Sequence, residues 1–193
     1  MFDYLQFDTP WPWYIARASA CLAYLFLWLA VFLGLSIRNP LLKKIVAPIY
    51  RCNFHCFLAA LAVFWAFIHA GSLLFDQSIN FSLADIAIPF FTQTIIVNVF
   101  YLGLGIIAFY IMMIMLLISY NKCRLNFWFW RLIHFLNPVA FILVVLHGYI
   151  IGTDTKNTVI GNSLLLASAI LCLLYFSNLI FFFWQKHSRL PMK

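Results

Sequence analysis

Five long apolar stretches constrain this chain more than any other feature of its sequence. A helix needs about 20 residues to cross a hydrocarbon core of roughly 30 Å. Only 9% of the residues are charged and 66% are hydrophobic, which excludes a soluble domain. We therefore predict an all-α integral membrane protein, a five-transmembrane-helix bundle. The predicted spans are about 13–36, 51–75, 96–120, 127–151 and 159–184.

The connections between these stretches are short and leave no room for a second folded unit. The sequence has no glycine-rich phosphate loop of the kind that binds dinucleotides. We expect residues 1–193 to form a single membrane domain without a flavin or NAD(P)H domain. The longest connection, about 76–95, mixes apolar and polar residues. It is expected to be an amphipathic or re-entrant segment at the outer interface, or else an early start of the third helix.

The positions of the charged residues predict the orientation of the bundle. All basic residues except Arg17 and Lys156 lie in or beside the connections after the first and third stretches, or in the C-terminal tail. By the positive-inside rule, the N-terminus is outside and the C-terminus is cytoplasmic. The net charge of +7 therefore describes a basic cytoplasmic face, and no nucleic acid partner is expected. The acidic residues all fall on the outer side: Asp3, Asp8, Asp76, Asp85 and Asp154.

Four histidines lie inside the apolar stretches as two spaced pairs, His55 with His69 and His134 with His147. An ionisable side chain within a membrane span is costly and therefore indicates a functional site. The second and fourth stretches cross the bilayer in the same direction. His55 and His134 are therefore expected in the inner leaflet, and the other two in the outer leaflet. A rise of 1.5 Å per residue separates the two levels by about 20 Å.

Two imidazoles at each of two depths have the arrangement of axial ligands for two stacked haems. Haem iron with an imidazole on each side is closed to small ligands and suits one-electron transfer. We predict that His55 and His134 bind an inner haem, and that His69 and His147 bind an outer haem. Two alternatives remain open. The histidines could form interhelical hydrogen bonds in a non-catalytic assembly or accessory subunit, or they could line the path of a metal-ion transporter.

The spacing of the second histidine pair predicts an irregular helix. His134 and His147 are 13 residues apart, which places their rings about 140° apart around a straight helix. Pro138 lies between them, lacks a backbone N–H and clashes with the preceding turn of a helix. We therefore predict a kink or local unwinding near Pro138.

Three arginines are candidate contacts for the anionic propionates of the haems. Arg51 and Arg131 precede the inner histidines by three or four residues, and Arg17 lies at the outer end of the first span. Each arginine could instead extend its charged group to the membrane interface without binding a cofactor. The fifth histidine, His187, lies in the basic tail and is expected to be a solvated interfacial residue.

The histidine-containing stretches resemble a known membrane family. Residues 50–55 (YRCNFH) and 67–69 (FIH) resemble the first ligand helix of the ferric reductase-like transmembrane domain, which NADPH oxidases and ferric reductases share. Residues 130–134 (WRLIH) and 138–154 (PVAFILVVLHGYIIGTD) resemble the second ligand helix. The resemblance covers about residues 13–184.

This resemblance implies a di-haem b-type membrane cytochrome in the bacterial inner (plasma) membrane. Such a protein relays electrons from a cytoplasmic reduced flavin to ferric iron, oxygen or a periplasmic redox protein on the outer side. Larger members of the family carry flavin and NAD(P)H domains on the same chain. Here two haem b groups are expected in the chain, and flavin is expected only on a partner, a flavin reductase or flavoprotein. The chain is then the membrane component of an oxidoreductase.

Overall fold

The computed structural model describes residues 11–46, 52–92, 97–121 and 126–188. The described residues are helical apart from short turns. In chain order the helices are α1 (Trp11–Ser36), α2 (Lys43–Val46), α3 (Cys52–Leu73), α4 (Leu83–Ala87), α5 (Val99–Tyr120), α6 (Phe127–His134), α7 (Asn137–Ile151), the 3-10 turn η3 (Asp154–Lys156) and α8 (Thr158–Ser188).

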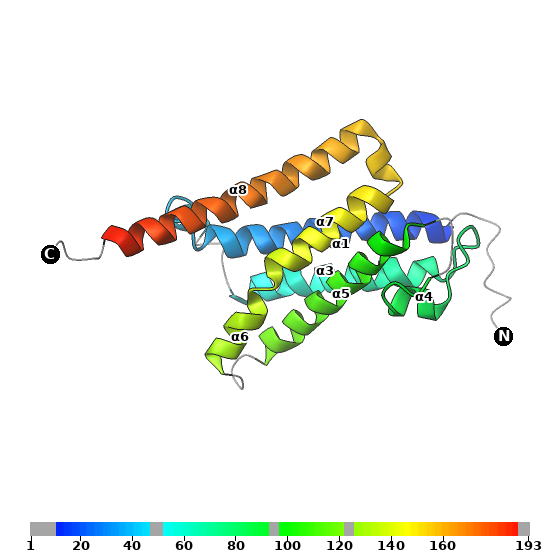
Figure 1. Ribbon diagram of the computed structural model, residues 1–193, viewed down its shortest axis with the longest axis horizontal. Helices are drawn as coiled ribbons and strands as arrows, with labels where there is room; N and C mark the ends of the chain where they lie inside the picture. Colours follow the sequence, from blue (N-terminus) through cyan, green and yellow to red (C-terminus); the bar gives the residue numbers. More distant parts are fainter. Residues whose placement is uncertain (1–10, 47–51, 93–96, 122–125, 189–193) are drawn as a thin grey trace.

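Within these ranges, five helical segments are long and apolar enough to cross a membrane, namely α1, α3, α5, the consecutive helices α6 and α7, and α8. The prediction of an all-α protein with five spans is therefore confirmed. Successive spans run in opposite directions in Figure 1, so α1 begins at one end of the bundle and α8 ends at the other. The most extensive contacts join α1 to α3 and α5 to α7.

Residues that are almost completely buried lie halfway along the bundle. Ala62 on α3 is 1% exposed and Ala140 on α7 is 0% exposed. Such small residues let membrane helices approach closely. Each alanine lies about midway between the two histidines of its span, so this layer separates the two histidine levels. Buried residues from all five spans form the layer, namely Leu27, Val31, Ala62, Val63, Met112, Ala140, Phe141 and Leu171.

The fourth span is broken where the sequence predicts an irregularity. α6 ends at His134, and α7 begins at Asn137 with Pro138 in its first turn. Between them, the Leu136 N–H donates to the Ile133 carbonyl at 2.9 Å, which is the three-residue spacing of a tightened turn. In an unbroken helix the proline ring would clash with the carbonyl four residues before it. The break removes this clash.

The segment between α3 and α5 forms turns and the short helix α4. A capping box begins α4, because the Ser82 backbone N–H donates to Asp85 Oδ2 at 2.8 Å and the Asp85 N–H donates back to the Ser82 hydroxyl. The Ser82 hydroxyl, followed by its N–H, holds the pKa of Asp85 below its usual value. Since α5 begins at Val99, the described part of 76–95 is a separate segment and not an early start of the third span.

Helix α8 is attached by hydrogen bonds to α1 and to the turn that follows α1. It lies beside α1 in Figure 1 and spreads away from α3 and α5. Polar groups in hydrocarbon are costly unless they are hydrogen-bonded, so the hydrogen bonds between these segments favour one position of α8 along α1. The bonds are Tyr24 Oη with Ser168 Oγ at 3.0 Å, Trp28 Nε1 to Ala167 O at 2.8 Å, Asn178 Nδ2 to Leu35 O at 2.9 Å and Asn39 Nδ2 to Ser177 Oγ at 2.9 Å.

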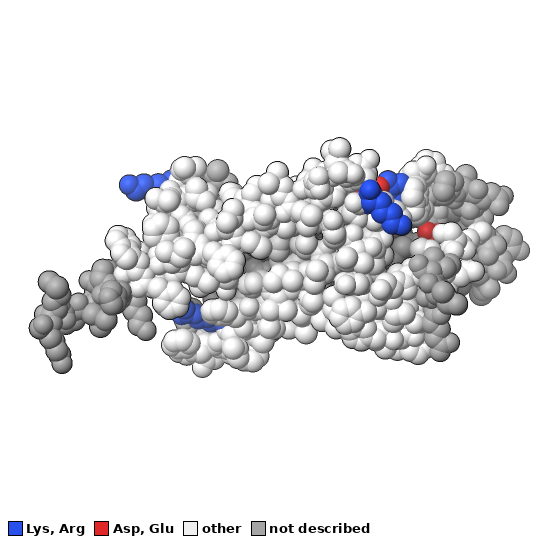
Figure 2. Space-filling model, turned by 45° about the horizontal axis from the view of Figure 1, so that its top comes forward, with Lys and Arg blue, Asp and Glu red and all other residues white. Residues whose placement is uncertain are grey.

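Charged side chains gather at the two ends of the bundle. Figure 2 shows them at both ends of one face, with an uncharged band between. Among the described residues, the end where α1 finishes and α6 begins carries basic groups: Arg38, Lys43, Lys44 and Arg131. The opposite end carries both signs, namely the basic Arg17 and Lys156 and the acidic Asp76, Asp85 and Asp154.

Replacing Tyr24 with Phe is expected to lower the free energy of unfolding by about 0.6 kcal/mol, because it removes one interhelical hydrogen bond and keeps the ring. Unfolding in mixed micelles by increasing SDS measures this change. Tyr14→Phe is the matched control, since Tyr14 is on the same helix and 51% exposed. An equal loss in both variants would contradict the role of the Tyr24 contact.

Candidate functional site

The four intramembrane histidines meet as two pairs between α3 and the α6–α7 span. The ring centres of His55 and His134 are 6.3 Å apart, with the ring planes inclined by 62°. The ring centres of His69 and His147 are also 6.3 Å apart, with an inclination of 81°. The structure thus brings together the same two pairs that the sequence suggests. One pair lies toward each end of the bundle.

The spacing within each pair matches what a shared metal ion requires. An imidazole nitrogen lies about 1 Å from the centre of its ring, and a transition metal binds it at about 2 Å. Two imidazoles on opposite sides of one metal ion therefore have ring centres about 6 Å apart. The observed 6.3 Å in both pairs is compatible with this arrangement.

Hydrogen bonds define which nitrogen carries the proton in His69 and His147, the pair that the sequence predicts to be the outer one. His69 donates from Nδ1 to the carbonyl of Ala16 on α1 at 2.9 Å. His147 donates from Nδ1 to the carbonyl of Tyr101 on α5 at 2.9 Å. Because a carbonyl can only accept, Nδ1 is protonated in both rings and Nε2 keeps its lone pair. This is the usual way in which proteins orient a metal-binding histidine.

A glycine on α5 makes the His147 contact possible. A Cβ atom at Gly105 would lie 2.4 Å from Nδ1 of His147, so no side chain fits between the ring and the helix. The ring therefore reaches the Tyr101 carbonyl one turn earlier on α5. On α1, a Cβ at Gly34 would lie 3.4 Å from Cε1 of His55, so this glycine also faces a histidine ring.

In the inner pair, Trp130 stacks on a histidine. Its ring centre is 5.0 Å from that of His134, and the planes differ by 19°. The two residues are one turn apart on α6, where side chains meet. The indole Nε1 is buried and has no hydrogen-bond partner among the described residues. Because an unpaired buried donor is costly, this N–H is a candidate contact for a polar group held at the site.

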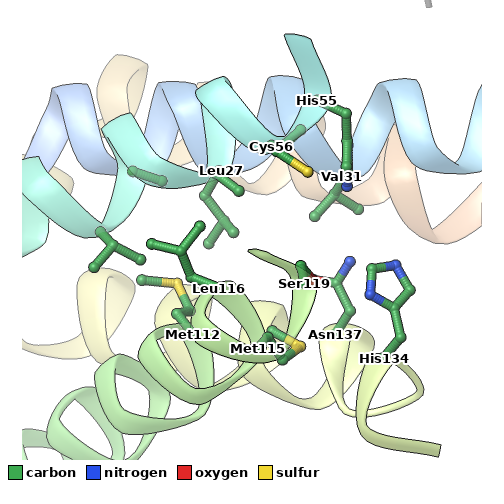
Figure 3. A pocket seen from close by; sticks show the side chains of 14 residues that line it. Leu27, Val31, His55, Cys56, Met112, Met115, Leu116, Ser119, His134 and Asn137 are labelled. Carbon is green, nitrogen blue, oxygen red and sulfur yellow. The ribbon is translucent and has the colours of Figure 1, made fainter. Parts of the chain in front are cut away.

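A largely apolar cavity lies beside the inner pair. In Figure 3 the side chains of His134 and Asn137 point from α6 and α7 toward the space below His55. The walls come from α1, α3, α5, α6 and α7. The lining residues are Leu27, Ala30, Val31, His55, Cys56, Ala59, Ala62, Val63, Met112, Met115, Leu116, Ser119, His134 and Asn137. The cavity therefore places an apolar space next to two imidazoles.

The three arginines suggested by the sequence are placed differently. Arg17 forms a bidentate ion pair with Asp154, in which Nε donates to Oδ2 at 2.8 Å and Nη2 donates to Oδ1. Arg131 is exposed on α6, with its guanidinium 5.8 Å from the centre of the Trp128 ring. Arg51 lies outside the described residues. Contacts of these arginines with haem propionates remain predictions.

Replacing Gly105 with Ala is expected to destabilise the protein by about 1–3 kcal/mol, because the added methyl group forces the His147 ring away from α5. Gly148→Ala is the matched control, since a Cβ there meets nothing within 4 Å. This control should gain up to about 1 kcal/mol from better helix propensity. Unfolding of both variants in the same detergent measures the difference. Stabilisation of both would contradict the close approach of His147.

Comparison with known families gives a match over most of the chain. The family model described as Ferric reductase like transmembrane component matches residues 19–145. This range includes His55, His69 and His134 and ends just before His147. The searches of curated proteins and of solved structures found no match. Since the family model matches more than half of the sequence, the chain belongs to the ferric reductase-like transmembrane component family.

Proposed function

We propose that this protein is a di-haem b-type membrane cytochrome that relays electrons outward across the membrane. In this proposal His55 and His134 hold an inner haem, and His69 and His147 hold an outer one. The observation that carries the proposal is the meeting of two imidazole pairs, each with ring centres 6.3 Å apart, in a member of this family. Haem held by two imidazoles supplies a one-electron centre that is closed to small ligands.

The number of protein ligands at each level supports haem over a metal ion bound by side chains alone. A porphyrin supplies four nitrogens to iron, so two imidazoles complete six-coordination. Zinc sites, in contrast, take three or four ligands from the protein. In the described parts of the chain, no third His, Cys, Asp or Glu joins either pair to form a metal-binding group.

The contacts around the imidazoles support the same assignment. The bonds from Nδ1 of His69 and His147 are interhelical hydrogen bonds, as an accessory subunit would also need. They use only one nitrogen of each ring, however, and leave Nε2 for iron. At the inner level, the buried N–H of Trp130 is a suitable donor to a propionate, beside the proposed roles of Arg51 and Arg131.

We propose that the donor is a reduced flavin on a separate cytoplasmic flavin reductase or flavoprotein. The basic end of the bundle, with Arg38, Lys43, Lys44 and Arg131, suits an acidic surface of such a partner or anionic lipid. The acceptor on the outer side is ferric iron, oxygen or a periplasmic redox protein. The proposed location is the bacterial inner membrane.

Protein purified from cells with ample haem supply is expected to show reduced b-type absorption bands and about two haems per chain. His69→Ala or His147→Ala should remove the outer haem and leave the inner one partly bound, because each change removes one ligand at one level. Absorption spectra and haem content measure both effects, with His187→Ala as a control that keeps both haems. A colourless wild-type preparation would overturn the proposed function. Equal loss of both haems from every single variant would overturn the assignment to two levels.

The proposed orientation places the end of α8 in the cytoplasm. A fluorescent protein that matures only in the cytoplasm, fused after residue 193, is expected to fluoresce in bacterial cells. A phosphatase that is active only in the periplasm should be inactive at the same position. The opposite pair of results would reverse the direction of electron flow in the proposal.

A further inference from the structure

An ion pair lies at the end of the bundle that holds the outer histidines. Arg17 Nε donates to Asp154 Oδ2 at 2.8 Å, and a second guanidinium nitrogen pairs with Oδ1. The guanidinium also lies over the ring of Trp13, 4.0 Å from its centre. The two charged side chains are 35% and 23% exposed, so solvent screens them less than a surface pair. The bidentate contact and the stacking together hold the guanidinium in one position.

The ion pair connects the two elements that position the outer histidines. Ala16, next to Arg17, is the residue whose carbonyl accepts the hydrogen bond from His69. Asp154 begins η3, directly after the helix that carries the other outer histidine. The Thr155 hydroxyl lies 2.7–3.3 Å from three carbonyl oxygens at the C-terminal end of that helix and donates its proton among them, which fixes η3 to the helix. A change at Arg17 therefore acts one residue from the carbonyl that holds His69, and a change at Asp154 acts just beyond the helix that carries His147.

The charges of the two residues have opposite effects on a nearby redox centre. Reduction of a haem adds one negative charge, which a fixed cation stabilises and a fixed anion destabilises. The Arg17 guanidinium alone would therefore raise the midpoint potential of the outer centre. The Asp154 carboxylate, bonded to it, cancels most of this effect.

We infer that Asp154 is a positioning residue that fixes the Arg17 side chain, one residue from the Ala16 carbonyl that holds His69, and balances its charge, and that this ion pair tunes the outer haem. The inference rests on the proposed function. It also gives Arg17 a role different from direct binding of a propionate, because in this role its charge acts together with the carboxylate to which it is bonded. A propionate contact would give Arg17 an effect that does not depend on Asp154.

A redox titration of the purified holoprotein, followed by absorption, tests this inference with a cycle of charge changes. Asp154→Asn should raise the midpoint potential of the outer haem, which is the haem lost in the His69 and His147 variants. Arg17→Gln should lower that potential, and the double variant should return it toward the wild-type value. Lys156→Gln is the control, because Lys156 is an exposed cation in the same turn. The control should leave both midpoint potentials unchanged, and none of the variants should change the midpoint potential of the inner haem.

The outcomes separate this inference from the proposed function. Shifts of the same sign in both single variants, or no shift with both haems retained, would overturn the inference and leave the di-haem assignment intact. A wild-type protein without haem would overturn the proposed function instead. If Arg17→Gln loses haem, the two single variants Asp154→Asn and Arg17→Lys replace it in the test. Asp154→Asn must raise the midpoint potential of the outer haem, and Arg17→Lys must leave that potential near the wild-type value. Any other result overturns the inference.

Discussion

The two histidine pairs depend on the break between α6 and α7. His134 and His147 are 13 residues apart, so a straight helix would turn one of the two rings away from α3. In the structure the span is broken at Pro138, and both rings meet their α3 partners. The distance between ring centres is 6.3 Å in each pair. On α3 the 14-residue spacing needs no such break. Helix α3 is therefore regular, whereas the α6–α7 span is broken so that both of its histidines face α3.

The sequence was sufficient for features that follow from length, hydropathy and helical period. These include the five spans, the break near Pro138 and the pairing of the histidines by level. Contacts between residues far apart in the sequence could not be predicted this way, because they depend on the rotation and depth of each helix. The ion pair of Arg17 with Asp154, the glycine at 105 and the stacking of Trp130 are of this kind. The only sequence sign of the ion pair was that Arg17 and Asp154, of opposite charge, are both predicted on the outer side.

Helix α8 differs from the other spans in how it is held. The family model ends at residue 145, so this helix lies beyond the matched range. Its buried contribution to the shared core is Leu171, whereas several hydrogen bonds attach it to α1. In lipid such bonds are directional and join particular residues, so they fix the rotation of a helix and its position along the membrane normal. Apolar contacts between a helix and acyl chains do not. The hydrogen bonds give α8 a defined register without tight packing.

The apolar layer between the two histidine levels has a consequence for bioenergetics. It contains the almost fully buried Ala62 of α3 and Ala140 of α7, and its buried members are all apolar. Protons need water or polar groups to cross a membrane, and a hydrophobic constriction excludes water. In the proposed function an electron thus crosses this layer without a compensating proton. Each electron transferred then moves one net charge across the membrane potential. The electrical work for a full crossing is about 2.3 kcal/mol per 100 mV.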